Sequence, residues 1–347
     1  MKINLLLLFC SLFLVACSSA QEETINESVF PGETWKVAKP ESVGFSSKKL
    51  RKAKSTFEDI GGAAALVIVK GHVIADWGYT DVPFDGRSIR KSLLNAVFGI
   101  YIDKGEVDIN MTLKDAAIND MGILTEKELN AAVKHLMTSS SGIYLPAAFE
   151  EQSHREKPSR GSHEPGVHFL YNNWDFNVLS TVINQASDKD LFEVFEDEIA
   201  KPLKMEHFQG KYHTAYLSQP ELSDHPAYLF LMSTKDLARL GLLYLNKGKW
   251  KNQQIISSDW VIESTSKQIE TGDAFYYNYG YLWWVSKREG DKGETPFLAR
   301  GAKSQYMYID PANELIIIFR DNPDSFVPVK KSEAYPLIGS IYGAMNR

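Results

Sequence analysis

The sequence is poor in cysteine. Its only two cysteines, Cys10 and Cys17, lie close to the N-terminus, so the rest of the chain cannot form an internal disulfide bond. The hydrophobic core must therefore hold the fold together. Roughly 300 residues follow the polar segment that ends at residue 42, enough to bury a large core in one large domain or two ordinary ones.

Basic clusters are missing as well. The chain has 38 lysines and arginines against 44 aspartates and glutamates, which gives a formal net charge of −6. Because no basic block is present, we do not expect nucleic acid as a partner. The chain also lacks strands and helices that alternate with glycine-rich phosphate loops, which disfavours a doubly wound nucleotide-binding fold.

Long hydrophobic runs are absent except at the N-terminus, where an apolar run from Leu5 to Cys17 follows Lys2. This run is too short to span a bilayer comfortably but suits a secretory signal peptide. Its end, Leu14-Val15-Ala16-Cys17, resembles a bacterial lipobox. We expect residues 1–16 to be a signal peptide and Cys17 to be the lipidated first residue of the mature protein. A lipid anchor would then hold the protein at a membrane of the bacterial cell envelope, on its periplasmic or outer-membrane side. An ordinary signal peptide cut near Ala20 is the alternative.

The remaining chain divides by its hydrophobic pattern. Residues 17–42 are polar and contain prolines, which predicts a flexible tether, and we expect one folded domain over residues 43–347. Strand patterns lie near both ends of this domain, with helical and loop patterns between them. The sequence predicts a sheet built from residues 43–91 and 266–347, a helical insert over 92–265, and an active site where they meet. The strand candidates are residues 63–69, 73–77, 281–285, 305–309 and 314–320.

A hydroxyl and an amine stand one helical turn apart in Ser88-Ile89-Arg90-Lys91. Apolar residues recur from Ile89 to Tyr101 at helical spacing, which predicts a helix with one buried stripe that begins at Ser88. A desolvated lysine can act as the base that activates a serine, and a serine N–H at a helix start can stabilise an oxyanion. Alternatively, Ser88 only caps the helix and Lys91 is solvated.

The Ser-x-x-Lys spacing alone is a weak signal, because it also occurs at Ser46 to Lys49 and at Ser264 to Lys267. Only Ser88 follows a predicted hairpin and opens a strongly periodic helix. Tyr171 is the second candidate, since it precedes a helical pattern and a phenol can pass protons to and from a serine. The alternative is that Tyr171 packs in the core and Asn173 caps the next helix.

Histidines suggest no metal site. His154, His163 and His168 lie in or next to a predicted loop over residues 144–165, and their spacing matches no common zinc signature. We therefore expect neither a metal nor another cofactor.

Three segments in order resemble motifs of the serine β-lactamase-related family. They are Ser88 to Ser92, Lys134 to Gly142 (KHLMTSSSG) and Pro165 to Asn173 (PGVHFLYNN). The resemblance is to the class C branch, which includes esterases, D-amino-acid peptidases and 6-aminohexanoate-dimer hydrolases, and it runs from about Val43 to the C-terminus. It implies an α/β (α+β) fold of the β-lactamase/transpeptidase type. In that fold an antiparallel sheet from both chain ends is flanked by helices and carries a mainly helical insert.

The resemblance also implies roles for the candidate residues. Ser88 would be the acylated nucleophile and Lys91 its activating amine, Tyr171 the general base and later acid, and Asn173 a substrate-positioning amide. The implied activity is that of a serine hydrolase acting on a small ester or amide through an acyl-enzyme. The alternatives are a D-amino-acid peptidase or β-lactamase with cell-wall-type substrates, and a non-catalytic ligand- or peptidoglycan-binding lipoprotein whose site has decayed.

The sequence departs from the family at its third motif, a strand that bears Lys-Thr-Gly or His-x-Gly. Residues 297–306 here read FLARGAKSQY. Either Ala299-Arg300-Gly301 or Ala302-Lys303-Ser304 could stand at the motif. We favour the first, because Gly301 would let substrate lie close to the strand. Arg300 or Lys303 would then contact substrate, unless both are solvated charges at a strand edge. Loss of the usual cation favours a small ester or amide over a β-lactam.

Overall fold

The computed structural model describes residues 24–150, 156–273, 275–288, 294–322, 325 and 327–346. The expected signal peptide, the expected lipidation site Cys17 and the loop histidine His154 lie outside these described residues.

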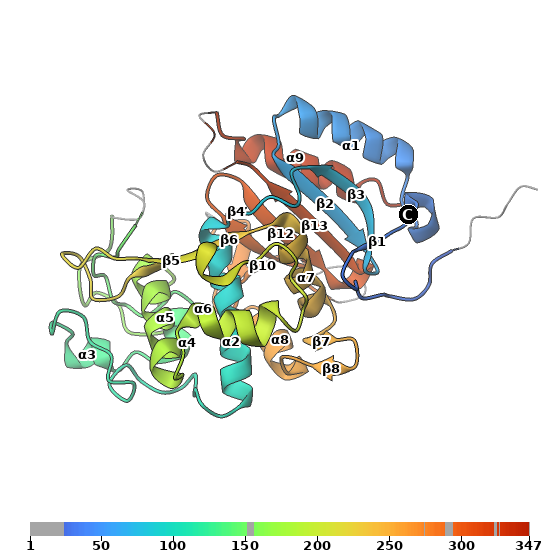
Figure 1. The fold of residues 1–347 in the computed structure, drawn as a ribbon. Coiled ribbons are helices and arrows are strands. Elements are labelled where there is room, and N and C mark those ends of the chain that lie inside the picture. Colours follow the sequence, from blue (N-terminus) through green and yellow to red (C-terminus); the bar gives the residue numbers. More distant parts are fainter. Residues whose placement is uncertain are drawn as a thin grey trace, which may run out of the picture.

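A mainly antiparallel sheet built from both ends of the chain forms the centre of the fold (Figure 1). Its strand order is β1-β3-β2-β13-β12-β11-β10-β9, and β2 pairs with β13 over the ladder from Ala64↔Arg320 to Val69↔Leu315. The prediction of a sheet made from the two chain ends is therefore confirmed. The strands are β1 (Lys36–Val37), β2 (Ala64–Val69), β3 (His72–Gly78), β9 (Tyr277–Tyr279), β10 (Trp284–Ser286), β11 (Phe297–Gly301), β12 (Gln305–Asp310) and β13 (Leu315–Arg320).

Helices cover both faces of this sheet. On one face, α1 (Ser47–Asp59) packs against α9 (Lys331–Tyr342), and on the other, α7 (Thr234–Leu245) lies across β2, β12 and β13 (Figure 1). In α1 the apolar residues Leu50, Ala53 and Phe57 form one buried stripe. The middle strands β2 and β13 are buried at every position, as continuous apolar runs covered on both faces require.

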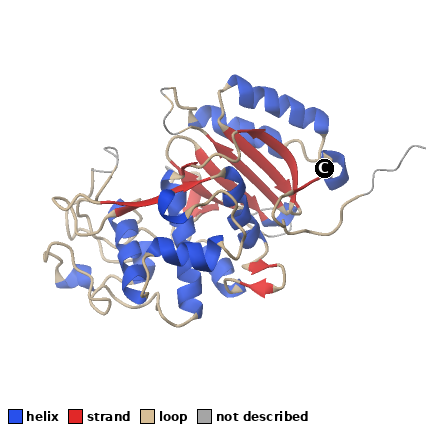
Figure 2. Ribbon diagram, in the orientation of Figure 1, coloured by secondary structure: helices blue, strands red, loops and turns tan. Residues whose placement is uncertain are grey.

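The mainly helical insert lies beside the sheet (Figure 2). It also holds a second, three-stranded sheet in the order β4-β6-β5 and a short β7-β8 hairpin. Its helices are α2 (Arg90–Asp103), α3 (Glu126–Leu129), α4 (Val133–Met137), α5 (Asn173–Ala186), α6 (Leu191–Phe195) and α8 (Ser258–Ser264). Its strands are β4 (Phe84–Asp85), β5 (Thr214–Leu217), β6 (Ala227–Met232), β7 (Lys249–Trp250) and β8 (Gln253–Gln254).

Helix α2 differs from the prediction of a single buried stripe. It is buried on nearly every side, and its polar residues find partners in the interior rather than in water. Ser92 donates to the carbonyl of Leu282 (2.9 Å), and Asn95 donates to the carbonyl of Tyr281 (2.9 Å). Ser92 and Asn95 made the helix look amphipathic in the sequence, but in the structure they hydrogen-bond α2 to the segment before β10.

The folded part begins earlier than the predicted tether allows. Residues 36–37 form β1, which pairs in parallel with β3, and the backbone N–H of Val29 donates to the carbonyl of Lys70. Upstream of β1, Phe30 packs edge-on against Trp250 (ring centroids 5.2 Å apart). Polar composition predicted a tether to residue 42, but backbone pairing and these aromatic contacts hold its last part on the domain.

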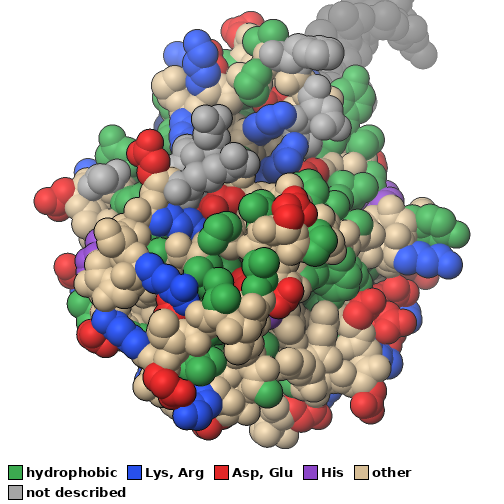
Figure 3. Space-filling view, turned by 90° about the vertical axis from the view of Figure 1, so that its left-hand side faces the viewer, with side chains coloured by type: hydrophobic (Ala, Val, Ile, Leu, Met, Phe, Trp, Pro, Cys, Tyr) green, Lys and Arg blue, Asp and Glu red, His purple; other side chains and the backbone are tan. Residues whose placement is uncertain are grey.

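Charged side chains of both signs are interspersed over the face of the molecule seen in Figure 3. Within the part of the chain that the structure describes, no helix is both long and apolar enough to cross a membrane.

Candidate active site

A tight turn carries Ser88 into the buried helix α2. The turn is a short 3₁₀ segment, Arg87–Ile89, and Arg87 has a positive φ of 49°. Asp85 stabilises this conformation, because its carboxylate accepts the N–H of Arg87 (2.7 Å) and pairs with its guanidinium (3.1 Å). Gly86 donates its N–H to the carbonyl of Phe230 in β6 (3.1 Å). These contacts fix Ser88 at the start of α2.

Lys91 lies directly behind Ser88. The two side chains are in hydrogen-bond contact, with 2.7 Å between Lys91 Nζ and Ser88 Oγ. Only 1% of Lys91 is exposed, and its Nζ lies 4.8 Å from the ring centre of Tyr171 and 4.5 Å from that of Phe176. Burial of an amine penalises its charged form, which is what a lysine needs to act as a base.

Tyr171 and Asn173 reach the site from the start of α5. Asn172, not Asn173, caps this helix, and its side-chain oxygen accepts the N–H of Trp174 (3.3 Å). Asn173 is thereby left to line the cavity beside Tyr171. Ser139 holds the segment from the second sequence motif, since its hydroxyl donates to the carbonyl of Leu170 (2.6 Å) and accepts the N–H of Asn172 (2.8 Å).

Strand β11 closes the opposite side of the site. A Cβ atom at Gly301 would lie 2.6 Å from the carbonyl oxygen of Gly86 and 3.0 Å from Cβ of Arg87, so only glycine allows this approach to the turn before Ser88. Arg300 lines the cavity with its guanidinium 5.5 Å from the ring of Trp284. Residues 299–301 thus stand against the turn, in the first of the two predicted registers.

Lys303 does not share that position. Lys303 and Ser304 both have a positive φ of 52°, in the turn that reverses the chain from β11 into β12. The hydroxyl of Ser304 donates to the carbonyl of Val329 (2.8 Å). The structure does not place Lys303 among the residues that line the cavity.

A buried arginine joins the turn to the sheet. Arg320 of β13 donates to the backbone carbonyls of Met232 (2.9 Å), Phe84 (3.1 Å) and Asp85 (3.3 Å), and its Nε bonds to the side chain of Gln305. Three elements that meet at the turn are therefore held by one guanidinium, which has several acceptors and is fully buried.

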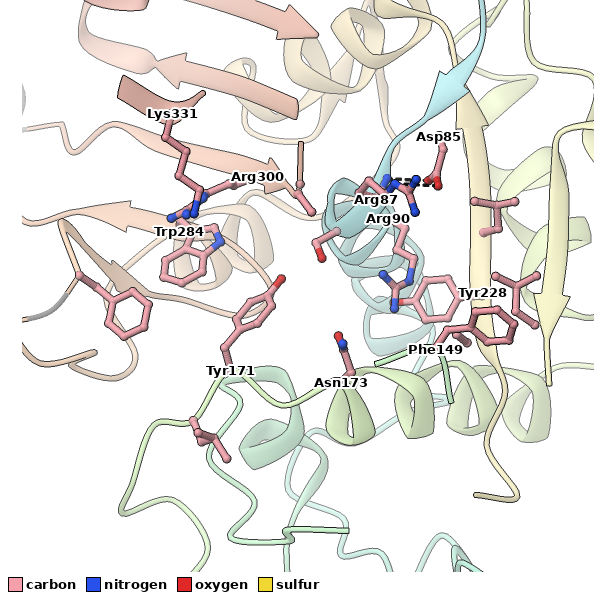
Figure 4. A pocket seen from close by; sticks show the side chains of 18 of the residues that line it. Asp85, Arg87, Arg90, Phe149, Tyr171, Asn173, Tyr228, Trp284, Arg300 and Lys331 are labelled. Carbon is pink, nitrogen blue, oxygen red and sulfur yellow. Dashed lines mark hydrogen bonds and ion pairs between the residues drawn. The ribbon is translucent and has the colours of Figure 1, made fainter. Parts of the chain in front are cut away.

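These residues surround a cavity of about 420 Å³ (Figure 4). Five of the predicted site residues line it or open onto it: Ser88, Tyr171, Asn173, Arg300 and Gly301. The sequence analysis missed other lining residues, because isolated charged and aromatic residues carry no motif. They include Asp85, Arg87, Arg90, Phe149, Glu156, Tyr228, Phe275, Trp284 and Lys331.

The loop histidines within the described residues do not form a metal cluster. His163 and His168 stack with ring centroids 4.1 Å apart, and the Tyr144 hydroxyl is 2.8 Å from His163 Nδ1. No group of three or more potential metal ligands is present in the described part of the chain.

Comparison with known proteins identifies the family of the chain. The family model Beta-lactamase matches residues 50–323, which is most of the chain. The chain belongs to the beta-lactamase family. The turn that carries Ser88, the Tyr171 segment and strand β11 all lie within the matched range. This family is one of hydrolases that share the beta-lactamase fold.

Solved structures of this family share the fold at low sequence identity. A candidate 6-aminohexanoate-dimer hydrolase from Bacillus anthracis has a TM-score of 0.66 at 18% identity, over 94% of this chain and 88% of its own. A penicillin-binding protein homologue from Pyrococcus abyssi has a TM-score of 0.64 at 17% identity, over 85% and 77%. A family VIII carboxylesterase has a TM-score of 0.63 at 15% identity, over 86% and 97%. No curated protein sequence matches the chain.

Proposed function

We propose that the protein is a serine hydrolase that cleaves a small ester or amide through an acyl-enzyme on Ser88. The observation that carries the proposal is the 2.7 Å contact between Ser88 Oγ and the buried amine of Lys91 at the wall of a cavity. A helix cap needs no such partner, and a solvated lysine would not be 1% exposed.

The chemistry follows from this arrangement. Ser88 Oγ forms a bond to the substrate carbonyl carbon while its proton passes to neutral Lys91, and the carbonyl oxygen becomes an oxyanion. The N–H of Ser88 and a backbone N–H of β11 stabilise that charge. Tyr171 then delivers a proton to the leaving alcohol or amine as its bond to carbon breaks. In the second half, Tyr171 takes a proton from water as the water attacks the acyl-enzyme ester. The bond from carbon to Ser88 Oγ then breaks, Lys91 returns its proton to Oγ, and a carboxylic acid leaves with all three side chains restored.

Strand β11 favours small esters and amides over β-lactams as substrates. It presents Ala299-Arg300-Gly301 where relatives of the family carry a lysine or histidine first. Arg300 is half-buried and lies over the ring of Trp284. Its charge therefore approaches the cavity from a direction different from that of a cation at position 299.

A fluorophosphonate probe and intact-mass analysis test the acyl-enzyme directly. We expect the wild-type protein to gain one adduct, mapped by peptide analysis to Ser88, and to hydrolyse p-nitrophenyl esters. The Ser88→Ala variant should do neither. A folded wild-type protein that forms no adduct and hydrolyses no ester would instead be a binding protein with the same fold. An assay on D-Ala-D-Ala peptides separates a D-amino-acid peptidase from an esterase.

We also propose that Cys17 carries a lipid anchor that holds the protein in the bacterial cell envelope. The support is the lipobox-like end of the apolar run. Metabolic labelling with an alkyne fatty acid should mark the wild-type protein and not the Cys17→Ser variant. Label that persists in the variant would contradict the proposal.

A further inference from the structure

The side of the cavity formed by α2 and β6 carries a positive charge that the described protein does not neutralise. Arg90 lies two residues after Ser88, at the end of α2 that opens to the cavity. Its one hydrogen bond is long, 3.5 Å from Nη2 to Asn177 Oδ1, and its Nε is buried without an acceptor. No ion pair between Arg90 and a carboxylate occurs within the described residues. A guanidinium has five N–H donors, and the described residues engage only one of those of Arg90.

Tyr228 adds a second unused donor at the same place. Its ring lies 4.8 Å from the Arg90 guanidinium, and its hydroxyl is buried without a partner. Burial raises the pKa of Tyr228, so the phenol keeps its proton and remains a donor. Buried polar groups in native proteins are nearly always hydrogen-bonded. Arg90 Nε and the Tyr228 hydroxyl are exceptions, and a bound ligand could supply the missing acceptors.

The two sides of the cavity differ in kind. Figure 4 shows Arg90 and Tyr228 on one side of Asn173, and Tyr171, Trp284 and Arg300 on the other. On the latter side Lys331 is exposed and Arg300 stacks on Trp284, so water or an aromatic face compensates their charges. Arg87 is already paired with Asp85. Arg90 has no ion pair like that of Arg87, and its only contacts with described residues are the Tyr228 ring and the long bond to Asn177.

The charge of the cavity is opposite to that of the whole protein. Four cationic side chains and only two acidic ones line it: Arg87, Arg90, Arg300 and Lys331 against Asp85 and Glu156. The chain as a whole has a formal net charge of −6. A positive cleft in a negative protein concentrates anionic substrates at the cleft.

We infer that Arg90 and Tyr228 form a carboxylate-binding subsite, and that the substrate is a small ester or amide bearing a carboxylate away from the scissile bond. The inference rests on the proposed hydrolase function and narrows its substrate class. A carboxylate can accept two parallel bonds from the guanidinium and one from the phenol, which satisfies the unused donors together. Neutral esters would leave the same donors unpaired.

Matched substrate pairs test the inference on the wild-type protein. Mono-p-nitrophenyl adipate is compared with methyl p-nitrophenyl adipate, and 4-acetoxybenzoate with its methyl ester, so that the charge is carried by the acyl part or by the leaving part. We expect kcat/KM to favour the carboxylate member of at least one pair by about tenfold or more. The Ser88→Ala protein supplies the rate of uncatalysed hydrolysis for subtraction.

Variants assign the preference to the subsite. Arg90→Gln should bring the ratio of kcat/KM for the carboxylate and the methyl ester close to one in each pair. Arg90→Lys should keep part of the preference, because the positive charge remains although the bidentate guanidinium is lost. Tyr228→Phe should reduce the ratio by about threefold or more. Lys52→Gln, on an exposed position of α1, is the control and should leave the ratio unchanged. The ratio should also fall as salt is added.

Each contrary result has a distinct meaning. Equal hydrolysis of both members in both pairs overturns the carboxylate inference and leaves the hydrolase proposal intact. A preference that survives Arg90→Gln overturns the assignment to Arg90. Absence of both ester hydrolysis and fluorophosphonate adduct refutes the proposed function itself, and the inference falls with it.

Discussion

The molecule contains the same residue spacing in two very different settings. At Ser46 and Lys49, the serine hydroxyl caps α1 by accepting the backbone N–H of Lys49 (3.3 Å), and the exposed Lys49 amine donates to the carbonyl of Gly343 (3.0 Å). At Ser88 and Lys91, the lysine amine itself meets the hydroxyl at 2.7 Å and is 1% exposed. A serine and a lysine three residues apart become a candidate catalyst only where the fold removes the amine from water.

The largest expected effect concerns the two serines. Ser88→Ala should lower kcat/KM for p-nitrophenyl esters by at least about a thousandfold, because the variant lacks the nucleophilic Oγ that forms the acyl-enzyme. Ser46→Ala should leave kcat/KM unchanged and lower the free energy of unfolding by about 1 kcal/mol through loss of the helix cap. Steady-state kinetics and chemical denaturation measure both. If both variants lost the same amount of kcat/KM, the claim that only Ser88 acts as the nucleophile would be wrong.

The two lysines come next. Lys91→Met keeps the length of the side chain but removes the base, so kcat should fall by about a hundredfold or more. Stability should change little, since a buried amine is replaced by an apolar group of similar size. Lys49→Met, at the exposed site, should affect neither quantity. An active Lys91→Met enzyme would show that another group takes the proton from Ser88.

A third comparison concerns the packing of the turn before Ser88. Gly301→Ala would bring a Cβ atom to 2.6 Å from the Gly86 carbonyl oxygen, so β11 must move away from the turn. We expect a loss of about 1–3 kcal/mol in stability together with at least about a tenfold loss of kcat/KM. Gly339→Ala in α9 meets no atom within 4 Å and should stabilise the protein by about 0.5–1 kcal/mol without a kinetic effect. Gly301→Ala with unchanged kinetics would contradict the packing argument.

The last comparison concerns stability alone and separates the Ser88 pair from another buried group. Burial raises the pKa of Asp175 to about 8, although the Ser141 hydroxyl donates to its carboxylate (2.6 Å). Because the folded pKa is above the unfolded one, folding favours the protonated acid, and its contribution to stability is lost as the pH rises towards 8. Asp175→Asn should therefore flatten the fall in unfolding free energy between about pH 5 and 8, by up to about 1.4 kcal/mol per pH unit. Denaturation curves measured across that range give the slopes, and parallel slopes would rule the effect out.

Most of the central sheet could be predicted from the sequence, because its strands are apolar runs bounded by turns. Residues 63–69 and 314–320 were predicted within one residue of β2 and β13. The strand predicted over residues 281–285 is less accurate, since β10 starts only at Trp284. Leu282 has a positive φ of 62°, and its N–H and carbonyl bond to Met137 and Ser92. These partners are distant in sequence, so no local pattern reveals the bend.

The candidate site was foreseeable where several motifs occurred in a fixed order. Ser88, Tyr171 and Gly301 line one cavity as expected, whereas Lys303 does not. The prediction for Lys303 was wrong because residues 302–304 form a tight turn that contains no proline, asparagine or glycine, the residues that usually indicate a turn. Tyr228 was missed because its position beside Arg90 depends on how β6 packs against the start of α2.

Helix α2 is buried by segments that come much later in the chain, and on the proposed mechanism a newly made chain is inactive until those segments have folded against it. The hydrogen bonds from Asn95 and Ser92 reach partners 186 and 190 residues further along the chain, and β11 comes later still. Until that last stretch has been synthesised and has folded back, Lys91 remains in water as an ammonium ion and cannot take a proton from Ser88. Contacts over such separations also form slowly. On the proposed mechanism, a partly synthesised or C-terminally truncated chain carries both residues of the pair and is inert.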